Sequence, residues 1–150
     1  MNCPQCGAEL PPGETCRDRF DLCLAKEFEH PATYGAVHYF TVVCYMLQHN
    51  AYSREAWLDT RAGLAQVLRQ GLTPADLRRQ NRQKLDSGRR KWKVTRGEKL
   101  AAVDSIAWTR TIADVRLDNH EVYCADVKLW ASNLLADTEA LMKKLEQDSF

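Results

Sequence analysis

The stretch from Ala32 to His49, ATYGAVHYFTVVCYMLQH, is apolar on nearly every side when it is drawn as a helix. No turn-forming residue interrupts it from 36 to 49, so its length favours a helix although the β-branched TVV at 41–43 also suits a strand. A helix that is apolar all round must be covered on all sides. We therefore expect a central buried helix with other helices packed around it.

Helical spacing and end signals predict these other helices. Phe20, Cys23, Leu24 and Phe28 recur at intervals of three and four, which predicts a helix over 16–29 that ends at His30 and Pro31. Further helices are expected from Ser53 to about Gly71, from Thr73 to about Gly88, over 97–107 as a short piece, and over 118–147. Strand-like alternation is absent from the rest of the sequence. The expected fold is all-α, an irregular bundle of four to five helices that forms a single domain over residues 1–150, behind an N-terminal zinc-knuckle loop of residues 1–15.

Composition narrows the class of protein. With 150 residues and 45% hydrophobic side chains, the chain can bury one core. It has no apolar run of membrane-spanning length and no secretory pattern at its start, so we expect a cytoplasmic protein without membrane contact. Six cysteines in that compartment indicate metal binding, reactive thiols or plain burial rather than disulfides.

Positive charge is concentrated in one segment, although the net charge is only +1. Residues 78–99, the basic segment, hold ten lysines and arginines against two acidic residues. A tryptophan within this run can stack on a base while its neighbours contact phosphates, so the nucleic-acid candidates are Arg89, Arg90, Lys91, Trp92 and Lys93. A solvated basic surface is the plainer interpretation, and no nucleic-acid-binding motif is present. A protein partner or a homo-oligomer is the alternative.

The N-terminus carries half of a zinc site. Cys3 and Cys6 are spaced as in a zinc knuckle, and Gly7 behind them allows the backbone to turn toward the sulfurs. A tetrahedral site needs two more ligands, and no second C-x-x-C follows.

Hairpin geometry selects the missing ligands. If helices 16–29 and 32–49 are antiparallel, Cys16 and His49 lie at the same end of the hairpin, where the loop enters. We therefore predict zinc bound by Cys3, Cys6, Cys16 and His49, with His38 as the alternative fourth ligand. Cys23 lies level with His38 near mid-hairpin, where burial in the core is the better interpretation.

The segments CPQCGAELPPG (3–13), CRDRFDLCLAKEF (16–28), YGAVHYFTVVCYMLQH (34–49) and TIADV (111–115), followed by LWA (129–131), resemble an uncharacterised family of small bacterial proteins, a domain of unknown function. The resemblance is dense over residues 3–49. It implies a helical fold and points to Cys3, Cys6, Cys16, His38 and His49, and it implies no activity.

Three functions fit these features. Four protein ligands are typical of structural zinc, so the first hypothesis is a binding module in which zinc fastens the zinc-knuckle loop to the bundle. The second is a metal-dependent enzyme that uses His38, His49 and His120 with Glu27 or Glu29 as base. The third is a redox sensor whose thiolates release zinc on oxidation.

Overall fold

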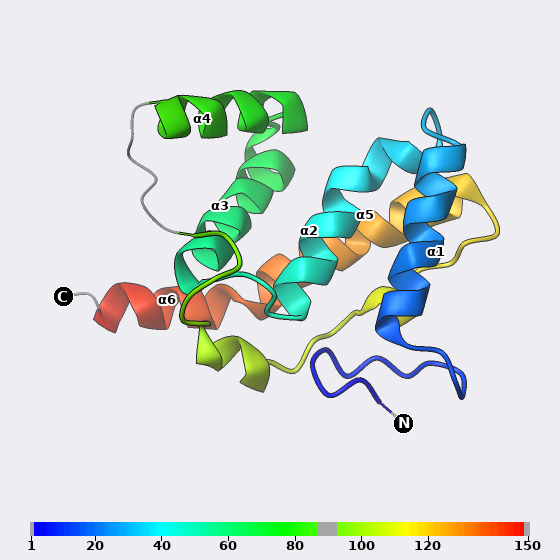
Figure 1. The fold of residues 1–150 in the computed structure, drawn as a ribbon, viewed down its shortest axis with the longest axis horizontal. Helices are drawn as coiled ribbons and strands as arrows, with labels where there is room; N and C mark the ends of the chain where they lie inside the picture. Colours follow the sequence, from blue (N-terminus) through cyan, green and yellow to red (C-terminus); the bar gives the residue numbers. More distant parts are fainter. Residues whose placement is uncertain (1, 87–92, 149–150) are drawn as a thin grey trace.

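A computed structural model describes residues 2–86 and 93–148. Its α-helices are α1 (Cys16–Glu29), α2 (His38–Gln48), α3 (Arg54–Gln70), α4 (Pro74–Asp86), α5 (His120–Asp137) and α6 (Glu139–Asp148). Short 3₁₀ turns are η1 (Tyr34–Val37), η2 (Ala101–Ser105) and η3 (Ile112–Asp114). Figure 1 shows α2 in the middle, with α1 beside it, α5 crossing behind it, and the N-terminal loop below the start of α1. The prediction of an irregular all-α bundle is confirmed.

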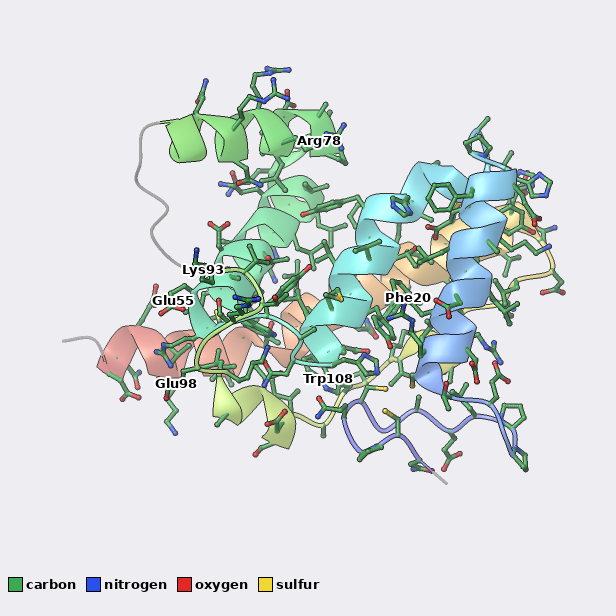
Figure 2. The ribbon with its side chains drawn as sticks, viewed as in Figure 1. Phe20, Glu55, Arg78, Lys93, Glu98 and Trp108 are labelled. Carbon is green, nitrogen blue, oxygen red and sulfur yellow. The ribbon has the colours of Figure 1, made fainter. Side chains whose placement is uncertain are left out.

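Helices α1 and α2 form the expected antiparallel hairpin. Thr15 caps α1 in a capping box with Asp18, and Phe20 stacks on Tyr45 of α2 with ring centroids 4.0 Å apart (Figure 2). The second helix is shorter than predicted, because residues 31–37 form a turn and η1 before regular helix begins at His38. At Gly35 a Cβ atom would lie 3.0 Å from the Glu27 carbonyl oxygen, so the missing side chain lets η1 approach α1 closely.

The core lies where α2, α3 and α5 meet. Its largest fully buried side chains include Trp57, Trp130 and Tyr123, and Leu47 of α2 is fully buried among the core residues. The Trp57 indole donates to the Leu47 carbonyl over 3.0 Å, which joins α3 to the end of α2. The expectation of a central buried helix is therefore confirmed in part, because α2 packs against its neighbours while Phe40 and Val42 are only half-buried and His38 is exposed.

The predicted helix over 118–147 is wrong in one respect, since it is divided at Thr138 into α5 and α6. The Thr138 hydroxyl donates to the carbonyls of Leu134 and Leu135, and it accepts a hydrogen bond from the buried Arg61 of α3 over 2.9 Å. Arg61 also donates to the Leu135 carbonyl over 3.0 Å. Thr138 has a φ of −99° and a ψ of 0° although its N–H still donates to the Leu134 carbonyl, so the helix bends there without losing that bond.

The predicted short helix over 97–107 is confirmed only in part, because the helical residues in that range are the 3₁₀ turn η2. Residues 93–99 run instead across the start of α3. The backbone N–H groups of Ser53 and Arg54 donate to the carbonyls of Val94 and Glu98, each over 2.8 Å. Figure 2 shows Lys93, Glu98 and Glu55 close together at this end of α3. Among the helices in the described ranges, none is long and apolar enough to cross a membrane.

Candidate metal centre

The zinc-knuckle loop turns back on itself between its two cysteines. The Cys3 N–H donates to the Ala8 carbonyl and the Gly7 N–H donates to the Cys3 carbonyl, both over 2.9 Å. Gly7 has a φ of 78°, in the left-handed region that favours glycine. This tight turn brings the sulfurs of Cys3 and Cys6 to the same side of the loop, as the C-x-x-C-G pattern predicts.

The open end of the hairpin supplies the other two candidate ligands. Cys16 is the first residue of α1, directly after the Thr15 cap, and His49 is the C-cap of α2. Because the helices are antiparallel, the start of one lies beside the end of the other. The four ligand atoms of Cys3, Cys6, Cys16 and His49 all lie within 4.8 Å of one another.

Two of the six separations between the ligand atoms are close to the edges of a tetrahedron around a zinc ion. With Zn–S bonds of about 2.3 Å and Zn–N bonds of about 2.0 Å, the edges are about 3.8 Å between two sulfurs and about 3.6 Å between sulfur and nitrogen. The Cys6 and Cys16 sulfurs are 3.6 Å apart, and Cys3 Sγ lies 3.8 Å from His49 Nε2. A disulfide would need about 2.05 Å, so the arrangement is one of four converging donors and not of a bonded pair.

The His49 ring is fixed in the orientation that a metal ligand requires. Its Nδ1–H donates to the Tyr45 carbonyl over 2.8 Å, so the lone pair is on Nε2, which faces Cys3. The Tyr45 ring covers the imidazole with centroids 4.2 Å apart. Burial lowers the pKa of His49, which keeps the ring neutral and able to coordinate.

The three thiols differ in their electrostatic surroundings. Burial raises the pKa of Cys6 and, further, that of Cys16. Burial acts in the same direction on Cys3, but the backbone N–H groups of Cys6 and Gln5 outweigh it and lower the Cys3 pKa. Of the three thiols, Cys3 is therefore the one whose surroundings favour the thiolate, whereas burial opposes ionisation of Cys6 and Cys16.

Two sequence-predicted histidines lie elsewhere. His38, the alternative fourth ligand, begins α2 and contacts Glu27 at the opposite end of the hairpin from His49. Eleven helical positions separate the two histidines, or about 16 Å along the axis. His120 starts α5 and lies near the Tyr34 ring. The structure therefore does not assemble His38, His49 and His120 into one metal site, and in the described part of the chain the Cys3, Cys6, Cys16 and His49 group is the one with metal-binding geometry.

The described parts of the basic segment lie on α4 and in the stretch that begins at Lys93. Arg78, Arg79 and Arg82 are exposed on α4, which projects from the bundle in Figure 1. Lys93 is exposed, and its carbonyl accepts a hydrogen bond from the Ser53 hydroxyl. The predicted contacts at Arg89, Arg90, Lys91 and Trp92 lie outside the described residues.

The chain matches one known protein family. A family model described as a family of unknown function, DUF5946, matches residues 1–139. The chain belongs to this family. No curated protein and no solved structure matches the chain.

In this DUF5946 chain the matched range contains all four candidate ligands and Tyr45, whose carbonyl orients His49. Sequence reasoning missed that backbone contact, although a histidine at the last turn of a helix is placed to bond the carbonyl four residues earlier. It also missed the polar contacts of Thr41 and Tyr123 with Glu27, because the three residues come from three different helices.

Proposed function

We propose that this protein is a cytoplasmic zinc-binding module in which Cys3, Cys6, Cys16 and His49 hold one structural zinc ion. The observation that carries the proposal is the convergence of four donor atoms within 4.8 Å of one another, two of whose separations have tetrahedral length. Three sulfurs and one imidazole nitrogen are a donor set that favours zinc over calcium or magnesium.

The four ligands come from three separate places, the zinc-knuckle loop and the facing ends of α1 and α2. A zinc ion there would fasten the loop to the helical hairpin. Because the protein supplies all four ligands, no position is left for a substrate or an activated water, which supports a structural rather than a catalytic metal. On this proposal the zinc holds a surface in shape, and the function of that surface is to bind a partner.

Elemental analysis of purified protein tests the metal proposal. The wild-type chain should contain one zinc per molecule, and Cys16→Ala and His49→Ala should each lose most of it. His38→Ala and Cys124→Ala are matched controls, since they remove the same side chains outside the cluster, and both should keep full zinc content. Wild-type protein without zinc, or equal zinc in all variants, would overturn the proposal.

The partner could be a protein, or it could be a nucleic acid. The three exposed arginines of α4 support a nucleic acid. Phosphate contacts release counterions, so binding should weaken steeply as salt rises. Reversing the charge of Arg89, Arg90 and Lys91 together, or of Arg78 and Arg82, should reduce binding to a single-stranded oligonucleotide and flatten this salt dependence. Reversal of Lys143 and Lys144 on α6 is the control for net charge. Binding that is independent of salt and of these variants would exclude this partner.

A further inference from the structure

A buried carboxylate lies at the opposite end of the hairpin from the metal centre. Glu27 of α1 is 3% exposed, and its carboxylate is hydrogen-bonded to side chains from two other helices. Oε2 accepts from the Thr41 hydroxyl of α2 over 2.6 Å and from the Tyr123 hydroxyl of α5, while Oε1 lies 2.6 Å from Nδ1 of His38. Burying a charge is costly, and these contacts offset the cost.

The contacts define the proton positions on His38. Burial raises the pKa of Tyr123, so its hydroxyl keeps its proton and donates, as the Thr41 hydroxyl does. The two hydroxyl donors at Oε2 favour the ionised form of the carboxylate, which can accept a hydrogen bond at Oε1 but has no proton to donate. Nδ1 of His38 therefore carries the hydrogen and donates to Oε1, which leaves the lone pair of the neutral ring on Nε2.

His38 connects this buried charge to the surface. Its side chain is 47% exposed, whereas that of Glu27 is 2% exposed. An open cavity of about 230 Å³ lies beside the ring and is lined by Glu27, Phe28, Pro31, Gly35 and His38. The exposed Phe28 ring has its centroid 5.9 Å from that of the imidazole. The cavity is therefore lined both by apolar side chains and by an imidazole of fixed orientation.

Holding the helices together does not require the histidine. Thr41 and Tyr123 already tie Glu27 to α2 and α5 from inside the core. The hydrogen bond between Glu27 and His38 instead fixes the orientation of the half-exposed imidazole ring. A carboxylate orients an imidazole in the same way in general-base sites.

We propose that Glu27 and His38 form a carboxylate–imidazole dyad that hydrolyses small esters with an apolar acyl group, which rests against Phe28 and Pro31. Nε2 of His38 accepts a proton from water while the water oxygen bonds to the acyl carbon. The same proton passes to the leaving oxygen as its bond to the acyl carbon breaks. Ester and water become acid and alcohol, and no other reagent is consumed. His38 is the catalytic residue, and Glu27 is a positioning residue.

The activity should be modest. The side chains that line the cavity offer no second hydrogen-bond donor to a developing oxyanion. General-base catalysis alone contributes typically ~10²–10⁴-fold, so a rate about 10²-fold above that of a variant without His38 is expected.

The test uses the full-length, zinc-loaded protein and p-nitrophenyl butyrate. Acylated cysteines give one equivalent of nitrophenol each, so turnover is measured after that burst. His38→Gln should lose the turnover, whereas His120→Gln and His30→Gln, which remove exposed histidines outside the dyad, should retain it. Glu27→Gln should lower kcat with little change in KM, because the apolar contacts of Phe28 and Pro31 remain.

Chemical rescue separates catalysis from a structural role. Imidazole added in solution should restore turnover to His38→Ala in proportion to its concentration, and should not do so for His120→Ala. Equal turnover in wild type and His38→Gln, or His38→Ala turnover that does not respond to imidazole, would overturn the proposal. Zinc content is measured on the same samples and should be unchanged, so that failure of this proposal is distinguishable from failure of the metal proposal.

Discussion

At the scale of single residues, Arg61 shows how a buried cation can join helices. Its guanidinium, in a side chain that is 9% exposed, donates to the Thr138 hydroxyl, to the Leu135 carbonyl and to Glu139, the last over 3.1 Å. Burial lowers the pKa of Arg61, and Glu139 opposes that effect. The cation thus satisfies acceptors on both sides of the bend between α5 and α6.

Arg61→Ala should lower the free energy of unfolding by about 3 kcal/mol, because it removes three hydrogen bonds of a buried cation and leaves a cavity where the side chain packed. Arg69→Ala is the matched control. Arg69 pairs with the same Glu139 but is 49% exposed, so its loss should cost less than about 1 kcal/mol. Urea unfolding measures both values, and equal losses would show that the contacts inside the bend contribute nothing specific.

Asp126 gives a prediction that depends on pH. Its carboxylate accepts from the side chain of Arg116 over 3.0 and 3.1 Å and from the Arg116 backbone N–H over 3.0 Å. The Arg116 hydrogen bonds hold the pKa of Asp126 below its usual value. The pair therefore stabilises the fold above about pH 4, where the carboxyl of the unfolded chain is ionised, and this contribution is lost as pH falls through the lower native pKa.

Asp126→Asn should reduce the free energy of unfolding by about 1–2 kcal/mol at pH 7, with the exposed Arg116 side chain keeping the loss at the lower end. The difference from wild type should shrink as the pH is lowered below 4. Asp21→Asn, which removes an exposed carboxylate of α1, should show little loss at either pH. A difference that is constant with pH would contradict the role of the charge.

At the level of the helices, α4 approaches α3 closely at Gly63. Gly63 of α3 has no side chain, and a Cβ there would lie 3.0 Å from a terminal carbon of Leu77 on α4. The exposed arginines of α4 contribute little burial. Leu77 therefore contributes a close contact between α4 and the bundle.

Leu77→Ala should release α4 locally while the rest of the bundle stays folded. Hydrogen exchange should show faster amide exchange across the first turns of α4, with protection in α2 and α5 unchanged. The free energy of unfolding of the whole protein should fall only slightly, by about 1 kcal/mol, because Leu77 is only partly buried. Arg79→Ala on the same helix is the control and should leave exchange unaltered. Loss of protection in α2 would show instead that α4 unfolds together with the core.

Local sequence signals predicted most helices, and tertiary contacts explain where they failed. Thr15, His30, Ser53 and Gly71 delimit α1 and α3 through backbone chemistry that acts within a few residues. The bend at Thr138 depends on Arg61, which is 77 residues away in the chain, so no local pattern reveals it.

The candidate metal centre could be predicted from the sequence because the pairing of two antiparallel helices decides which of their residues lie side by side. Similar distances from the turn at Pro31 place Cys16 and His49 at the same end of the hairpin, although the sequence left His38 as the alternative fourth ligand. The Glu27 constellation was not predicted in the same way. Glu27 and His38 were named as candidates, but Thr41 and Tyr123 become neighbours of Glu27 only through the crossing of α5 over the hairpin.

At the scale of the whole molecule, the proposed zinc ion would connect the zinc-knuckle loop to the bundle. Cys6 and Ala8 of the loop are buried, whereas most residues over 9–14 are exposed. The loop thus makes a small apolar contact of its own and relies on the ligand set for further attachment.

Cys3→Ser should lower Tm by about 10 °C, and a strong chelator should have the same effect on the wild type, because several kcal/mol of binding free energy are linked to folding. Far-UV circular dichroism at 25 °C should stay largely helical, while protease should cut within residues 9–14 faster. Cys124→Ser, at a partly buried cysteine outside the cluster, should respond to chelator as the wild type does. Melting that is insensitive to both changes would show that the loop is held without metal.

Helix α2 carries an imidazole at each end, with His38 as its first residue and His49 as its C-cap. Inserting or deleting one residue between them would rotate one ring by about 100° relative to the other and shift it by about 1.5 Å. Either His49 would turn away from the three sulfurs or His38 would turn away from Glu27. The number of residues between these histidines is therefore fixed for any chain that retains both constellations, whereas changes in length are tolerated far better in surface loops.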